Sequence, residues 1–274
     1  MSIRSIMVYV DSCRATAGRA EFAVALAAEH EAHLTGLHGC DSGLLPLYME
    51  PSPQLVEQQQ RWAADEAAKS RAIFEQATKG ASVPCEWLEV QGPVGQVATS
   101  VARASDLTIV SQEDPNDRAY STPATLPEDL VFSAGRPILV LPHAGARGPI
   151  RHILIGWNGS REAARAVQDA LPLIRRAEKV TVMSVTARGA ADPLDLPGAD
   201  ICATLARHGV EVQAVRAAAT GTEPGEMLLS QAASGGADMI VMGAYGRSRL
   251  REFILGGATR SVLQGMTVPV LLSQ

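Results

Sequence analysis

Short runs of apolar, often β-branched residues recur along the chain, without the strict alternation that marks a half-buried strand. In the first half the clearest runs cover residues 3–10, 106–111 and 137–141, and weaker ones cover 33–39 and 85–90. Runs of this kind are typical of strands that are buried on both faces. The pattern therefore predicts parallel strands with helices packed on both sides.

Helical stretches separate these runs. Residues 17–30 are rich in alanine, and residues 53–78 form a long amphipathic segment that is rich in glutamine. The second half alternates in the same way, with predicted strands at 152–157, 179–185, 210–216, 238–243 and 268–273 and predicted helices at 161–176, 197–207, 224–234 and 257–265. Five strands joined by crossover helices predict a doubly wound α/β unit, in which ligands bind beyond the carboxyl ends of the strands.

An internal repeat divides the chain into two copies of one domain. Similar residues recur in three places: 3–11 in 150–158, 106–110 in 238–242, and 136–140 in 268–272. The last two pairs share one offset of 132 residues, which is hard to obtain by chance. We therefore predict domains at residues 1–146 and 147–274, with the proline- and glycine-containing stretch 142–149 as the linker.

The charge of the chain excludes several classes of partner. The 29 acidic residues outnumber the 24 basic ones and give a formal charge of −5. A general nucleic-acid binder would show a basic excess, and a membrane-surface binder a basic tail, so neither partner is expected. The first residues turn polar too early for a signal peptide, and no apolar run is long enough to span a bilayer. The expected location is the cytoplasm.

The four cysteines lack the spacing of a metal site. None forms a C-x-x-C pair, and no cysteine and histidine spacing resembles a zinc site, so no metal is predicted. Free thiols in a reducing compartment are the simplest interpretation. A redox pair of Cys13 and Cys40, each of which follows a predicted strand, stays open as the alternative.

A glycine-containing segment near the end of the chain carries the clearest chemistry. It starts where a predicted strand ends, at Gly243 and Gly246, and finishes after nine further residues at Gly256, where a predicted helix begins. Glycine lets backbone approach a ligand closely, and a helix N-terminus attracts anions. Nearby arginines add positive charge: Arg247, Arg249 and Arg260. The segment therefore has the features of a phosphate-binding site. Glycines after strands are also common in α/β proteins for structural reasons, and the motif is neither a Walker loop nor a dinucleotide fingerprint.

This spacing, followed by a Val-Pro-Val final strand, resembles the universal stress protein family, and the whole chain resembles its tandem, two-domain members. The resemblance implies a five-stranded parallel sheet of order 3-2-1-4-5 in each half, flanked by helices. It also implies pairing through the last strands, so that the halves form an internal pseudo-dimer, with a homodimer as a further option. Some members bind ATP at the glycine motif and others bind no nucleotide; their role is in stress survival.

The family's nucleotide site maps onto the second half with two departures. Gly257 stands where the family has Ser or Thr, and Asn158 replaces an acidic residue that faces the nucleoside. Asn can still hydrogen-bond a ribose hydroxyl or an adenine edge. The backbone of Val185 matches the position that meets adenine, and Trp157 is either a ligand contact or a packing residue. The candidate binding residues are Trp157, Asn158, Val185, Gly243, Gly246, Arg247, Gly256, Gly257, Ala258 and Thr259.

The first half keeps the family's acidic residue as Asp11 but loses the glycines. When the two halves are aligned with the offset of 132, the glycine positions of the first half hold Ser111, Asp114 and Ala124, and Thr125 stands at the Ser/Thr position. Asp114 and its acidic neighbours Glu113 and Asp117 would repel phosphate. We therefore expect a degenerate domain without a nucleotide, whose loop 112–127 and glutamine-rich helix are free to contact a protein partner.

These observations favour a stress-response protein that binds one adenine nucleotide in its second domain and acts through nucleotide-dependent interactions. ATP is the expected ligand, with ADP or AMP as alternatives and Mg²⁺ as an optional companion. No catalytic elbow or zinc-protease motif is present, so at most a slow ATPase is expected, without assigned catalytic residues. A nucleotide-free scaffold or chaperone-like interaction protein is the alternative.

Overall fold

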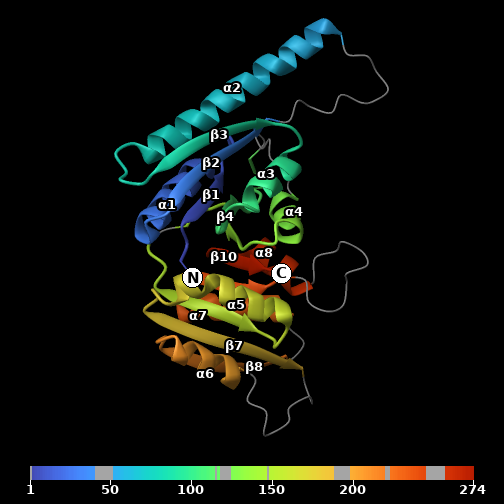
Figure 1. Cartoon of the computed structure of the whole chain (residues 1–274). Coiled ribbons are helices and arrows are strands. Elements are labelled where there is room, and N and C mark those ends of the chain that lie inside the picture. The colour runs from blue at the N-terminus through green and yellow to red at the C-terminus, as the bar shows by residue number, and fades with distance from the viewer. Residues whose placement is uncertain are drawn as a thin grey trace. The chain divides into compact units, whose positions relative to one another are not determined.

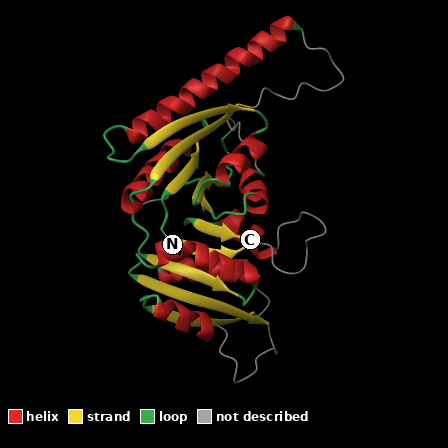
Figure 2. Ribbon diagram, viewed as in Figure 1, coloured by secondary structure: helices red, strands yellow, loops and turns green. Residues whose placement is uncertain are grey.

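The chain folds into two compact units, Ile3–Ala134 and Gly135–Gln274, which are described separately (Figure 1). The computed structural model describes residues 2–40, 52–114, 116–117, 125–146, 148–187, 198–219, 223–244 and 257–274. In both units helices lie on the two faces of a sheet (Figure 2). This is the layered α/β arrangement that the alternating pattern predicts.

The described residues of the first unit form four parallel strands and four helices. The strands are β1 (Ser5–Tyr9), β2 (His33–Cys40), β3 (Cys85–Gln91) and β4 (Leu107–Ser111), and the helices are α1 (Thr16–His30), α2 (Pro53–Thr78), α3 (Val94–Ala102) and α4 (Leu126–Ser133). β1 pairs with both β2 and β4, and β2 also pairs with β3. α1 packs against α2, and α3 packs against α4. The sequence pattern predicts α1 and α2, whereas α3 and α4 were not expected.

Helix α2 buries little of its length. Ser52 caps it by accepting a hydrogen bond from the Leu55 backbone N–H at 3.3 Å, and a proline follows in the first turn. Its buried residues, Ala67, Ser70 and Phe74, all belong to its second half. There Phe74 lies against β2 so closely that a Cβ at Gly36 would come within 2.7 Å of its ring. α2 is therefore anchored at one end, while its first half extends past the strand ends (Figure 1).

In the second unit, the part of the chain that the structure describes forms six strands and four helices. They are β5 (Ile138–Leu141), β6 (His152–Trp157), α5 (Arg161–Ile174), β7 (Lys179–Ala187), α6 (Ala199–Arg207), β8 (Val212–Ala219), α7 (Pro224–Gly235), β9 (Met239–Gly243), α8 (Gly257–Gly265) and β10 (Val270–Ser273). β6 pairs in parallel with β7 and β9, β7 pairs with β8, and β9 pairs with β10. β5, the last strand of the first repeat, pairs antiparallel with β10.

The strand order confirms the predicted class of fold. It is β3-β2-β1-β4-β5 for the first repeat and β8-β7-β6-β9-β10 for the second, which is 3-2-1-4-5 in each case. The antiparallel partnership of β5 and β10 joins the last strands of the repeats, as the resemblance implies. It also places β5 in the second unit, so the boundary between the compact units falls at residue 135 of the sequence. The repeat boundary at 146/147 stays a prediction.

The repeat is also visible as a hydrogen-bonded clamp below the first strand of each copy. Asp106 Oδ2 accepts from the backbone N–H groups of Arg4 at 2.8 Å and Ser5 at 3.1 Å. Asp238 Oδ2 accepts from those of Arg151 at 3.0 Å and His152 at 2.8 Å. The aspartate that recurs at the offset of 132 thus holds the start of β1 or β6 in register.

Replacing Asp238 with Ala is expected to lower the free energy of unfolding by about 2 kcal/mol, because hydrogen bonds to a charged group contribute roughly 1.5–3 kcal/mol. Urea denaturation would measure the change, with Asp200→Ala as the control aspartate; the Oδ1 of Asp200 accepts from the Ile201 N–H within its own helix end. Equal stabilities of the Asp238 and Asp200 variants would show that the clamp contributes nothing.

Candidate functional site

The carboxyl ends of three neighbouring strands meet at one edge of the second unit. Trp157, the last residue of β6, pairs with Ser184 of β7, and Gly156 pairs with Met242 of β9. The residues that follow these strands, Asn158 among them, therefore lie at this edge of the sheet. In a doubly wound sheet this edge is where ligands bind.

Asn158 forms the turn between β6 and α5. Its Oδ1 accepts a hydrogen bond from the Ser160 backbone N–H at 3.1 Å, and Gly159 between them has a φ of +68°. Ser160 then caps α5 by accepting from the Ala163 N–H at 3.1 Å. The side chain of Asn158 is exposed, and its amide nitrogen still offers two donors. Asn158 therefore shapes the turn and presents hydrogen-bond donors at the edge.

Gly243 is explained by packing against α5. A Cβ at this position would lie 2.4 Å from the backbone nitrogen of Ala163 and 2.5 Å from the carbonyl carbon of Glu162. The end of β9 thus touches the first turn of α5, and only glycine leaves room for this contact. Sequence reasoning assigned Gly243 to a phosphate cradle alone and missed this structural requirement.

Glu162, in the first turn of α5, is a buried carboxylate that sequence reasoning did not single out. Its Oε1 accepts from Arg161 Nε at 2.5 Å, and its Oε2 has no hydrogen-bond partner among the described residues. Burial raises the pKa of Glu162, but hydrogen bonds from Arg161, the backbone and Ser160 outweigh it and leave the pKa below its usual value. An ionised Glu162 also suits the positive end of the helix dipole.

Trp157, which ends β6, lies beside the residue that precedes α6. It is half-buried, and its Cδ1 lies 3.6 Å from where a Cβ would sit on Gly198, the residue with φ of +92° that precedes α6. Val185 lies in β7 with its backbone paired to Ala217 of β8. The packing contact of Trp157 is thus observed, and a ligand contact of its exposed part stays a prediction.

Helix α8 presents its N-terminus after the glycine segment. It is described from Gly257, and the first four N–H groups of a helix have no partner within the helix. α7 fixes its position, because a Cβ at Gly225 would come within 2.6 Å of the Ala258 carbonyl oxygen. Gly257 is exposed, whereas Thr259 is buried. The predicted residues Gly246, Arg247 and Gly256, together with Arg249, lie outside the described residues.

At the corresponding edge of the first unit, Asp11 is engaged by the protein itself. Its Oδ1 lies 2.7 Å from Arg19 Nη2, and the two side chains are 1% and 3% exposed. The Thr16 hydroxyl and the Cys13 backbone N–H also donate to Asp11, the latter at 3.3 Å. The acidic residue that the family uses for the nucleoside is therefore buried in an ion pair.

A second carboxylate takes the place where an anion would approach the first unit. Asp117, which follows β4, accepts a hydrogen bond from the Arg14 backbone N–H at 2.7 Å and is buried. Asp114 Oδ1 accepts from the Asn116 N–H at 2.9 Å. The Asp117 hydrogen bond thus joins the loop after β4 to the loop after β1, whereas the Asp114 hydrogen bond lies within the loop after β4. Ser111 is buried, and Ala124 lies outside the described residues.

Comparisons with known proteins agree with this geometry. The sequence profile of the universal stress protein family matches residues 149–274. A universal stress protein from Archaeoglobus fulgidus DSM 4304 superimposes with a TM-score of 0.72 at 15% identity, over 98% of this chain and 96% of that one. A putative universal stress protein from Pseudomonas aeruginosa UCBPP-PA14 gives 0.62 at 18% identity, over 99% and 93%. No curated protein matches the chain significantly.

A doubly wound domain repeated in tandem defines a two-domain α/β protein. Residues 149–274 match the universal stress protein family, and the fold of the whole chain is similar to that of universal stress proteins. Among the described residues no helix is long and apolar enough to cross a membrane. In the same part of the chain, no cluster of three His, Cys, Asp or Glu side chains could hold a metal ion.

Proposed function

We propose that the second unit binds one adenine nucleotide, ATP in the first place and ADP or AMP as alternatives, and that the bound nucleotide alters how the protein interacts with partners. The observations that carry the proposal are the neighbouring strands β6 and β9, which end at one edge of the sheet, and the exposed first residue of α8, Gly257. Backbone N–H groups and a helix dipole at one sheet edge favour phosphate. The family contains members that bind ATP with this motif.

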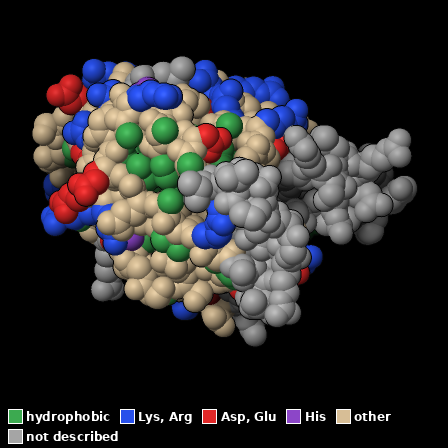
Figure 3. Space-filling model, turned by 90° about the horizontal axis from the view of Figure 1, so that it is seen from below, with side chains coloured by type: hydrophobic (Ala, Val, Ile, Leu, Met, Phe, Trp, Pro, Cys, Tyr) green, Lys and Arg blue, Asp and Glu red, His purple; other side chains and the backbone are tan. Residues whose placement is uncertain are grey.

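The distribution of charge supports an anionic ligand in the second half. Residues 147–274 carry 14 basic and 11 acidic side chains, whereas residues 1–146 carry 10 basic and 18 acidic ones. On the face that Figure 3 shows, Lys and Arg side chains lie at many points along the margin, and Asp and Glu side chains at fewer. A positive potential attracts an anionic ligand and raises its rate of association.

Different residues would bind the phosphates and the nucleoside of the nucleotide. The N–H groups of Gly257 and Ala258, and the exposed guanidinium of Arg260, would hold phosphate oxygens. The Asn158 amide and the Val185 backbone would hold the nucleoside. Gly243, Gly246, Gly256, Arg247, Trp157 and Thr259 complete the proposed set. Any Mg²⁺ would arrive with the triphosphate and neutralise part of its charge. Because the proposal assigns no general base, hydrolysis would be slow.

Mass spectrometry of the small molecules released from freshly purified, denatured protein tests the proposal, together with thermal shift against ATP, ADP and AMP. A ligand at about 100 times its dissociation constant stabilises a protein by roughly 2.7 kcal/mol. We expect a copurified adenine nucleotide or a clear thermal shift. Neither a bound nucleotide nor a shift at millimolar concentration would point to the nucleotide-free alternative.

One observation favours that alternative, a scaffold or interaction protein. Two large apolar side chains of α2 are exposed, Leu55 at 41% and Trp62 at 64%. Trp is enriched where proteins contact one another and is costly to leave in water. A protein partner that contacts α2 fits both proposals, and the nucleotide experiment separates them.

A further inference from the structure

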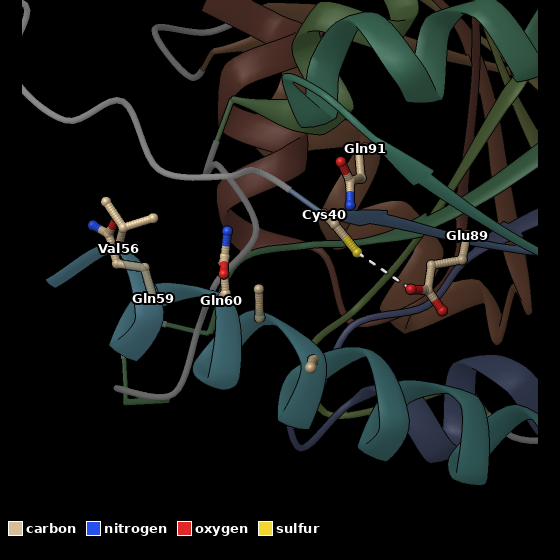
Figure 4. A pocket seen from close by; sticks show the side chains of 8 residues that line it. Cys40, Val56, Gln59, Gln60, Glu89 and Gln91 are labelled. Atoms are coloured by element: carbon tan, nitrogen blue, oxygen red, sulfur yellow. Dashed lines mark hydrogen bonds between the residues drawn. The ribbon is translucent and has the colours of Figure 1, made fainter. Parts of the chain in front are cut away.

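A pocket of about 350 Å³ opens in the first unit, between the first half of α2 and the carboxyl ends of β2 and β3 (Figure 4). Cys40 ends β2 and pairs in register with Gln91, which ends β3. The lining consists of Cys40, Val56, Gln59, Gln60, Ala63, Ala64, Glu89 and Gln91. The volume lies at the lower end of the range for small-molecule sites, which is roughly 300–1,000 Å³.

The pocket exists because α2 packs on the sheet only through its second half. Phe74 fills the space between helix and strands farther along and contacts Trp87, with ring centroids 5.6 Å apart. Over the strand ends the helix instead carries two small residues, Ala63 and Ala64. Figure 4 shows Gln60 extending from α2 toward the strands that carry Cys40 and Gln91. The helix therefore lines one side of the pocket with the apolar side chains of Ala63 and Ala64 and with polar glutamine side chains.

The lining has the chemistry to receive a cation with N–H donors. Glu89 is the only charged side chain that lines it among the described residues, and it accepts a hydrogen bond from Cys40 Sγ at 3.9 Å. Burial, and then the Glu89 carboxylate, raises the pKa of the Cys40 thiol, which therefore stays neutral. Three glutamine amides supply further acceptors, and Val56 with the two alanines suits a short aliphatic chain.

The charge of this half of the chain agrees with that chemistry. Residues 1–146 carry eight more acidic than basic side chains, 18 against 10. The local potential therefore favours cations, in contrast to the second half. An anionic ligand would meet a carboxylate here without a lysine, arginine or histidine among the described lining residues to balance it.

We propose that this pocket binds a small organic cation, an aliphatic amine or guanidine, with its charged group on Glu89, its other N–H groups on the glutamine amides, and its alkyl chain on Val56, Ala63 and Ala64. The site is separate from the proposed nucleotide site and does not depend on it. It gives the degenerate first unit a ligand of its own, opposite in charge to a nucleotide.

Calorimetric titration of the full chain with agmatine tests the proposal, because agmatine carries an amine and a guanidinium on a short alkyl chain. The matched control ligand is 4-guanidinobutyrate, in which a carboxylate replaces the amine. We expect agmatine to bind at least tenfold more tightly than the control. Glu89→Gln keeps the shape of the side chain and should weaken agmatine binding about tenfold, since hydrogen bonds to a charged group contribute roughly 1.5–3 kcal/mol. Glu86→Gln removes the same charge from the same strand outside the pocket, and should change it less than twofold.

Thiol alkylation locates the binding in the pocket. Saturating agmatine should slow iodoacetamide labelling of Cys40 at least threefold, as read by peptide mass spectrometry, and leave the exposed Cys85 at the other end of β3 unchanged. Three results would overturn the proposal: no agmatine binding, equal binding of the control ligand, or equal losses in the Glu89 and Glu86 variants. Unchanged labelling of Cys40 under saturating agmatine would also overturn it. The nucleotide proposal survives each of these outcomes, because no residue is shared.

Discussion

Replacing Arg19 with Met should lower the free energy of unfolding by about 3–5 kcal/mol, the loss that follows when one partner of a buried ion pair is removed. Arg19 and Asp11 are almost fully buried and 2.7 Å apart. Without the guanidinium, the Asp11 carboxylate keeps its hydrogen bonds from Thr16 and Cys13 but loses its counter-charge. Urea denaturation followed by circular dichroism would measure the change.

Two further variants separate the ion pair from general effects of arginine loss. Arg61 forms an exposed pair with Glu57 one helical turn away, at 2.6 Å, so Arg61→Met should cost less than about 1 kcal/mol. Adding Asp11→Asn to Arg19→Met removes the unpaired charge and should recover most of the lost stability. If Arg19→Met cost no more than Arg61→Met, the buried pair would not be what holds the β1–α1 turn.

A carboxylate introduced at the start of α8 should abolish most nucleotide affinity. We expect Gly257→Asp to weaken ATP binding at least tenfold, because it places a negative charge beside the phosphates and cancels the helix dipole. The substitution fits the fold, since a Cβ at Gly257 lies 3.6 Å from its nearest described neighbour, Glu223 Oε2, which is ordinary contact. Gly257→Asn is the matched uncharged control and should lose much less.

The same position allows the opposite change. Gly257→Ser restores the hydroxyl that the family carries there, and one added hydrogen bond to a charged phosphate should tighten ATP binding about tenfold. Calorimetric titration of the four proteins should therefore rank them Ser, Gly, Asn, Asp from tightest to weakest. A series in which Asp and Asn bind ATP equally well would remove α8 from the site.

The fold was largely predictable because buried parallel strands leave a clear trace in the sequence. Apolar runs in the sequence predicted the strands β1, β4, β6 and β9. The strand order followed from the resemblance to the universal stress protein family, which the internal repeat supports. Two short helices of the first unit, α3 and α4, escaped the prediction. α3 has only nine residues, and three of them are valines and one is a glycine, which have low helix propensity, so packing on the sheet stabilises it more than sequence does.

The site was predictable only in part. The positions of Asn158 after β6 and of Gly257 at the start of α8 follow from strand and helix boundaries that the sequence marks. The contact of Gly243 with α5 does not, because it depends on how closely a helix packs against a neighbouring strand. The Asp11–Arg19 pair is similar: eight residues separate the partners, and only the turn between β1 and α1 brings them together.

The number of ATP molecules bound per chain tests the central claim most directly. Equilibrium dialysis of the full chain with labelled ATP should give about one nucleotide per chain, lost in Gly257→Asp and retained in the doubly substituted Asp11→Asn, Arg19→Met protein. Saturation at two nucleotides per chain, or at none, would contradict a single site in the second unit. One nucleotide that persists in Gly257→Asp but disappears in the Asp11 variant would place the site in the first unit instead.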